Sequence, residues 1–296
     1  MFAASIGNPI LLAVFIGFVL VMLALDLGVF HRKAHVVGLR EAAIWSGVWV
    51  ALAGVFAALV WLRAGDQAAL EFTAGYLLEK ALAVDNIFVF VVIFSALHVP
   101  ADSQHRVLLW GILGALVLRA AFIFAGGIFL EAFDWATYVF GALLVVTGIK
   151  LLLQRHETAE GEETGVVRFV RRLPFLGARP FLLAVVVIEL TDVVFAVDSI
   201  PAVFAVTRDP FIVFTSNIFA ILGLRSMYFL LAGVVRKFRY LKVGLSAVLV
   251  FVGAKMLLAD LIEIPIVCSL AAIAILLGGA GVASAWRPLR EGRSRR

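Results

Sequence analysis

Residues 181–206 read FLLAVVVIELTDVVFAVDSIPAVFAV, an apolar run that contains three acids, Glu189, Asp192 and Asp198. A helix needs roughly 20 mostly apolar residues to cross the hydrocarbon core of a bilayer, so this stretch is long enough to span it. Carboxylates inside such a span are costly, and they either have interior partners or serve a function. The stretch therefore predicts a transmembrane helix whose acidic side faces the interior of a helix bundle.

The composition of the whole chain extends this prediction. Of its 296 residues, 64% are hydrophobic and 15% are charged, and the mean hydropathy is +1.09. Soluble domains are about 45–50% apolar and about 25% charged, so the excess apolar surface here must face lipid. The one cysteine, Cys268, excludes an internal disulfide. We expect an all-α polytopic membrane protein of nine transmembrane helices, at residues 9–30, 42–62, 74–97, 107–130, 135–153, 181–206, 211–234, 242–262 and 265–286.

The basic residues predict the orientation of these spans. Most of the 25 Lys and Arg lie in alternate loops, at residues 31–41, 98–106, 154–180 and 235–241 and after residue 286, whereas the other loops contain Arg63 and Arg208. Lys and Arg are retained on the cytoplasmic side during insertion. We therefore expect a multi-pass protein of the inner or plasma membrane, with its N-terminus outside and its C-terminus in the cytoplasm. The positive net charge therefore does not indicate nucleic-acid binding.

An internal repeat divides the chain. The sequence AVDNI at residues 83–87 reappears as AVDSI at 196–200, Leu118-Arg119 as Leu224-Arg225, and GIKLL at 148–152 as GAKML at 253–257. These matches predict one membrane domain over residues 1–296, with three-helix units at 74–153 and 181–262 and a cytoplasmic linker at 154–180. The spans at 9–30, 42–62 and 265–286 lie outside the repeat. Because each unit has an odd number of spans, the second copy is inverted, which is typical of secondary transporters.

The charges inside the spans indicate the kind of ligand. Oxygen donors surround the buried acids, and every histidine lies in a loop or beside one. Oxygen ligands without thiolate or imidazole favour hard divalent cations such as Mn²⁺, Mg²⁺ or Ca²⁺ over zinc or copper. The bases are interpreted as charge-compensating groups for an empty site, with pure salt-bridge pairing or anion binding as alternatives. The acids are Asp26, Glu79, Asp85, Glu189, Asp192 and Asp198, and the compensating bases are Arg119, Arg225, Lys150 and Lys255, with Lys80 interpreted mainly as a structural partner.

Pro201 gives a further expectation for the span at 181–206. A proline inside a helix removes one hydrogen bond and clashes with the carbonyl group four residues earlier. We expect this helix to be broken at Asp198 and Ser199, which would turn Asp198 and freed carbonyl groups toward a common cavity.

The motifs resemble those of a known family. The stretches Glu79–Asn86, Glu189–Pro201 and Thr215–Ser226, with LDLGVF at residues 25–30, are similar to signature sequences of the TerC family. The resemblance implies a tellurium-resistance-type protein of the LysE-like transporter superfamily, similar to bacterial Mn²⁺ exporters. It also implies a metal pathway that comprises Asp85, Asn86, Glu189, Asp192 and Asp198, with Glu79, Asp26 and Asn217 as further members.

The expected function is export of a hard divalent cation, most simply Mn²⁺ as substrate, by alternating access around the acids of the third and sixth spans. Protons are the expected coupling ion, and neither a covalent cofactor nor an enzymatic activity is expected. A membrane scaffold or assembly protein with an indirect effect on tellurite or metal tolerance is the alternative. An oxyanion carrier built on Arg119 and Arg225 is a weaker one, because the buried acids would repel tellurite. An intramembrane aspartyl protease is disfavoured, because neither Asp85 nor Asp198 follows a Gly-x-Gly sequence.

Overall fold

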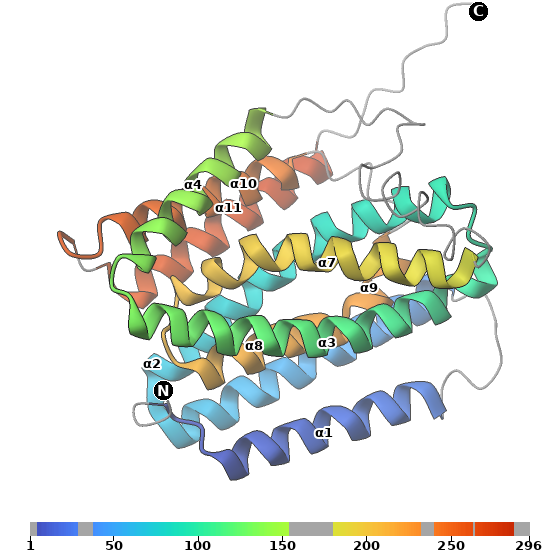
Figure 1. Cartoon of the computed structure of the whole chain (residues 1–296), viewed down its shortest axis with the longest axis horizontal. Helices are drawn as coiled ribbons and strands as arrows, with labels where there is room; N and C mark the ends of the chain where they lie inside the picture. The colour runs from blue at the N-terminus through green and yellow to red at the C-terminus, as the bar shows by residue number, and fades with distance from the viewer. Residues whose placement is uncertain (1–4, 29–37, 154–179, 232–239, 263, 287–296) are drawn as a thin grey trace, which may run out of the picture.

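The computed structural model describes residues 5–28, 38–153, 180–231, 240–262 and 264–286, and every regular element within these ranges is an α-helix. Figure 1 shows them gathered into one bundle, in which α1 begins and α11 ends at opposite ends. The helices are α1 (Pro9–Gly28), α2 (Leu39–Ala96), α3 (Ala101–Ala132), α4 (Ala136–Leu153), α7 (Pro180–Phe204), α8 (Pro210–Leu222), α9 (Leu224–Leu231), α10 (Leu241–Leu257) and α11 (Ile266–Trp286). The predicted linker lies outside the described residues except for Pro180.

Several of these helices have the length and apolarity of membrane spans. The described parts of α2, α3, α4 and α11 each meet that requirement alone, and α8 and α9 meet it together as a pair bent by 42°. Many large apolar side chains are exposed on the outside of the bundle, such as Val117 on α3 and Ile275 on α11. The prediction of an all-α membrane protein with several apolar helices is confirmed.

The predicted spans at 42–62 and 74–97 form one element, α2, which has a sharp kink. Its 58 residues exceed the roughly 40 that two crossings require. Gly65, in the loop expected between these two spans, has φ 84° and ψ −175°, a conformation that residues with a Cβ rarely adopt. Figure 1 shows the light-blue first half and the cyan second half as two helices that diverge from this kink.

The expected break in α7 is wrong. The helix continues through Pro201 to Phe204, and the backbone N–H of Ala205 donates to the carbonyl of Pro201 at 3.0 Å. One proline removes one hydrogen bond, and the turns on either side keep the helix intact. The helix break lies instead in the next span, where Gly223 separates α8 from α9.

Asp209 starts α8 and anchors the chain that leads into α1. Its carboxylate caps α8 by accepting a hydrogen bond from the N–H of Phe211 at 2.8 Å, and Pro210 occupies the first helical position. The same carboxylate accepts hydrogen bonds from the Ser5 hydroxyl at 2.6 Å and the Ile6 N–H at 2.7 Å. One residue therefore joins the start of α8 to the segment before α1.

Helices α4 and α10 approach each other closely at small residues. A Cβ on Gly253 would lie 2.7 Å from the carbonyl oxygen of Gly141, and one on Gly148 would lie 2.9 Å from that of Ser246. The Ser246 hydroxyl also donates to the Gly148 carbonyl. Small residues allow backbones to approach in this way, which is how helices associate in lipid.

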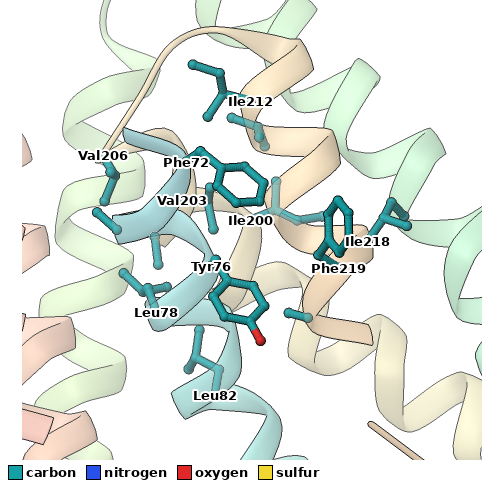
Figure 2. Close-up of a cluster of buried hydrophobic side chains, with 14 of the residues drawn as sticks. Phe72, Tyr76, Leu78, Leu82, Ile200, Val203, Val206, Ile212, Ile218 and Phe219 are labelled. Atoms are coloured by element: carbon teal, nitrogen blue, oxygen red, sulfur yellow. The ribbon is translucent and has the colours of Figure 1, made fainter. Parts of the chain in front are cut away.

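Aromatic and branched side chains fix the second half of α2 between α7 and α8. Figure 2 shows Phe72 and Tyr76 of α2 beside Ile200 and Val203 of α7 and Phe219 of α8. The rings of Phe72 and Phe219 meet edge to face, with their centroids 5.9 Å apart. This α2–α7–α8 core holds together the helices that carry the buried side chains of Glu79, Asp192 and Asn217.

Candidate ion site

Arg119, in the middle of α3, lies at the centre of a buried charged cluster. Its Nη2 is 3.0 Å from Asp192 Oδ1 on α7, and its Nε donates to Asp192 Oδ2 at 3.2 Å. Its Nη1 donates to Glu79 Oε2 on α2 at 2.7 Å. The three residues are at most 4% exposed. One guanidinium thus bridges two buried carboxylates, and the triad carries one negative charge in excess.

Two neutral side chains complete this cluster. Asn217 on α8 donates through Nδ2 to Glu79 Oε1 at 2.7 Å and accepts from Arg119 Nη1 at 3.3 Å. Ser199 on α7 lies 3.5 Å from the same nitrogen. Three helices, α2, α7 and α8, therefore direct two carboxylates, an amide and a hydroxyl at the guanidinium of a fourth, α3. We call Glu79, Arg119, Asp192, Ser199 and Asn217 the Arg119 cluster. Its oxygen donors suit a hard cation, and the guanidinium occupies the position between them.

The two acids of the repeated AVD motif lie elsewhere. Asp198 accepts a hydrogen bond from the Thr147 hydroxyl of α4 at 3.0 Å, and Lys150, on the same helix, attracts the carboxylate. Asp85 on α2 is attracted by Lys242 on α10. Each acid therefore faces a base of the other predicted repeat.

Glu189 occupies a separate position against α3. Its carboxylate lies directly over Gly114, where a Cβ would overlap all three carboxylate atoms. Its Oε2 is buried and has no hydrogen-bond partner among the described residues. A glycine at position 114 is required for this arrangement.

The other predicted site residues whose side chains the structure describes do not join the Arg119 cluster. Asn86 is 5% exposed on α2, and Arg225 is 5% exposed on α9. Asp26 belongs to α1, but its side chain lies outside the described part. Among the described residues, no group of three or more His, Cys, Asp or Glu side chains has the arrangement of a metal site. Of the predicted residues whose side chains the structure describes, the cluster brings together Glu79, Asp192, Asn217 and the compensating base Arg119.

Lys255 lines a pocket at the end of the bundle where α2 bends. The pocket has a volume of about 240 Å³, and Glu71, Thr207 and Arg208 also line it. Lys255 donates to the Ser269 hydroxyl at 3.0 Å, and Thr207 donates to Glu71 at 2.5 Å. Along α2 and α7, apolar residues of the α2–α7–α8 core come between this pocket and the Arg119 cluster.

Two residues of these sites, Thr147 and Gly114, could not be predicted from the sequence pattern. Thr147 directly precedes the repeated GIKLL stretch. The repeat therefore marks this part of the chain, but it does not indicate that Thr147 donates a hydrogen bond to Asp198. Gly114 has no signal in the sequence, because its function is to leave room for Glu189, which is distant in the chain.

Comparison with known proteins agrees with this architecture. The model of the integral membrane protein TerC family matches residues 64–291. An "Uncharacterized membrane protein STKORF319" of Myxococcus xanthus is 59% identical over 95% of this chain and 93% of its own length. The "Putative membrane-bound redox modulator Alx" of Escherichia coli (strain K12) is 45% identical over 98% and 99%, respectively. No solved structure matches. The chain thus belongs to the TerC family of integral membrane proteins.

Proposed function

We propose that this protein is a transporter that exports a hard divalent cation, with Mn²⁺ as the substrate. The observation that carries the proposal is the Arg119 cluster, in which three helices direct oxygen-bearing side chains to the buried guanidinium of a fourth. A bilayer-spanning bundle has no structural need to bury Glu79 and Asp192 together, because each charge costs at least ~2.5 kcal/mol at mid-membrane on insertion scales. An ion pathway gives these carboxylates a purpose.

We further propose that the chain crosses the membrane nine times and contains an inverted repeat. In this arrangement α2 counts as two crossings, and α8 with α9 counts as one. The repeat aligns Gly148 with Gly253 and, at the same spacing, Gly141 with Ser246. Exchanging the two copies converts the Gly141–Gly253 contact into the Ser246–Gly148 contact, and both occur. The packing of α2 on α8 likewise exchanges with that of α7 on α3. These pairings support a two-fold axis in the membrane plane.

In the proposed mechanism Arg119 is a tethered counter-ion. With no cation bound, its guanidinium offsets part of the negative charge of Glu79 and Asp192 and limits the penalty of two buried carboxylates. An entering cation displaces Arg119 and takes over oxygen donors of the cluster. The apolar residues of the α2–α7–α8 core close the route toward the pocket that Glu71 and Lys255 line. Movement of one repeat against the other opens that route, and a proton replaces the cation for the return step.

A flux measurement tests the proposal. Inside-out vesicles of cells that make the wild type, Asp192→Asn or Asp198→Asn are supplied with Mn²⁺, and Mg²⁺, Ca²⁺ and tellurite serve as competitors. We expect Mn²⁺ uptake by the wild type, competition by the hard cations only, and a loss of about tenfold or more in each variant, equivalent to ~1.4 kcal/mol. Glu131→Gln is the control, because this exposed acid at the end of α3 is outside the Arg119 cluster. Absence of uptake by the wild type would refute the proposal.

A membrane scaffold is the second candidate function, because the ion pairs of Arg119 with Glu79 and Asp192 would also stabilise a bundle with a purely structural role. Exchanging the charges in the double variant Arg119→Asp/Asp192→Arg separates the two candidates. A scaffold would regain folding and metal tolerance in the double variant relative to either single one. A transporter would regain folding but not flux, because the exchange moves the oxygen donors.

Two other functions have less support. An oxyanion would have to displace two carboxylates from Arg119 before binding to it. The relative from E. coli carries the name of a redox modulator. The present sequence has one cysteine, Cys268, which offers no thiol pair for disulfide chemistry.

A further inference from the structure

The break between α8 and α9 leaves the end of a half-helix inside the bundle. α8 ends at Leu222, α9 begins at Leu224, and the two are bent by 42°. The last carbonyl groups of a helix have no partner four residues later, and they carry the negative end of the helix dipole. Every residue of α8 is buried. This end of α8 therefore carries a partial negative charge that attracts a cation.

The side chain of Lys80, from α2, fills that position. Its Nζ donates to the carbonyl oxygen of Ala220, in the last turn of α8, at 3.2 Å. The same ammonium lies 5.6 Å from the centroid of the Tyr76 ring. Gly223 leaves space for it, since a Cβ there would lie 2.5 Å from Nζ. These neighbours are a carbonyl group and an aromatic face, which suit a cation without requiring a carboxylate.

Lys80 is linked to the Arg119 cluster through adjacent residues on both helices. Glu79, the preceding residue of α2, accepts the hydrogen bond from Asn217, which lies one turn before Ala220 on α8. Two consecutive α2 residues therefore bind the C-terminal half of α8. Glu79 binds the side-chain amide of Asn217, and Lys80 binds the backbone carbonyl of Ala220. The direction of the bend in turn places Arg225, the second residue of α9.

We propose that Lys80 is a built-in cation at the α8–α9 break, in the place where other transporters bind an exchangeable ion. Unwound carbonyls and half-helix C-terminal ends coordinate Na⁺ in several secondary transporters. A covalently attached ammonium makes such an ion unnecessary. Lys80 is then a positioning residue that fixes the bend and Asn217, and transport needs no alkali-metal ion. Only this last statement rests on the proposed transport function.

Chemical rescue tests the assignment without relying on transport. Lys80→Ala removes the equivalent of n-propylammonium, so that compound is added to the detergent-purified variant and the thermal midpoint Tm is measured. We expect Lys80→Ala to lower Tm and n-propylammonium to raise it saturably, as a ligand of the folded state does. 1-Propanol, of the same shape but uncharged, should not do so. The wild type should not respond.

Matched variants distinguish charge from packing. Leu82→Ala truncates a buried apolar residue two positions further along α2, so its lower Tm should not respond to n-propylammonium. Lys80→Arg keeps a cation and should retain most of the stability, whereas Lys80→Met keeps the stem but loses the charge and should not. If Lys80→Met is as stable as the wild type, or if Leu82→Ala responds like Lys80→Ala, the assignment is wrong. If Lys80→Ala does not fold, the difference in Tm between Lys80→Met and Lys80→Arg still shows whether the charge of residue 80 stabilises the protein.

The flux assay tests the consequence for coupling. Wild-type Mn²⁺ uptake is compared in NaCl, KCl and N-methylglucamine chloride, and we expect equal rates. Lys80→Met should lose more than about fivefold of the rate in all three media, and Lys80→Arg should retain most of it. A wild-type rate that requires Na⁺ or K⁺ would overturn the inference. If the wild type shows no uptake at all, the proposed function fails, and the thermal measurements still decide the role of Lys80.

Discussion

At the residue scale, the side chain of Arg119 determines whether Glu79 and Asp192 can remain buried together. Both carboxylates have lost their contact with water, and the guanidinium supplies three of the hydrogen bonds that replace it. Removing one partner of a buried ion pair costs far more stability than the intact pair contributes, because the other charge is left uncompensated. The same carboxylates become available to a metal ion once the guanidinium is absent.

Arg119→Met is therefore predicted to have two effects. In the absence of metal it should lower the free energy of unfolding by about 3–5 kcal/mol, because it leaves buried carboxylates without a cation. Added Mn²⁺ should raise its Tm more than that of the wild type, because the ion no longer competes with a tethered cation. Thermal unfolding in detergent with and without Mn²⁺ measures both. An Arg119→Met protein that does not respond to Mn²⁺ would count against metal binding at this cluster.

Gly114 gives a second prediction at this scale. Gly114→Ala should destabilise the protein by about 1–3 kcal/mol, because the new Cβ overlaps the Glu189 carboxylate. Glu189→Ala should relieve the clash, so the double variant should be more stable than the sum of the single changes predicts. Gly54→Ala on α2 is the control, since nothing lies within 4 Å of a Cβ there. Additive effects of the two changes would show that Glu189 does not lie against Gly114.

At the element scale, the crossing of α4 with α10 depends on backbone-to-backbone contact. The atoms nearest to a Cβ at Gly253 or Gly148 include backbone carbonyls, which cannot move aside as the end of a side chain can. An added methyl group must therefore separate the helices. Since the two glycines occupy equivalent positions of the sequence repeat, the consequences should also be equivalent.

We predict that Gly148→Ala and Gly253→Ala each lower the free energy of unfolding by about 1–3 kcal/mol, and by similar amounts. Gly278→Ala on α11, where nothing lies within 4 Å of a Cβ, should have little effect. Unfolding of the purified variants in detergent provides the comparison. Strongly unequal effects at positions 148 and 253 would argue against the two-fold relation between the repeats.

At the scale of the whole molecule, the ends of the helices divide into two groups. The bend within α2, the turn after α3 and the turn between α7 and α8 gather at one end of the bundle in Figure 1, and the turn between α2 and α3 lies at the other. The distribution of Lys and Arg predicts that the first end is outside the cell. Because the sequence has a single cysteine, its replacement gives a cysteine-free background for mapping.

In a Cys268→Ser background, a cysteine at Asp134 should react with a membrane-impermeant maleimide in intact cells. A cysteine at His98 should react only after the cells are lysed. Asp134 lies between α3 and α4, and His98 lies between α2 and α3, so the two report on opposite ends of one helix. The reverse pattern would invert the proposed topology, and labelling of both positions in intact cells would show that α3 does not cross the membrane.

The sequence by itself determined the membrane class, the approximate position of the helices and the presence of Glu79, Asp192 and Arg119 inside them. Hydropathy and charge are properties of short stretches, and they do not depend on neighbouring helices. Which side chains meet was decided only in the tertiary structure. Asp192 and Asp198 are about 120° apart around a regular helix, so the unbroken α7 directs one to Arg119 and the other to Thr147. Pro201 left its helix continuous, while Gly223 ended one beside Lys80. The rotation of each helix and the site of its break follow from packing against partners distant in the chain.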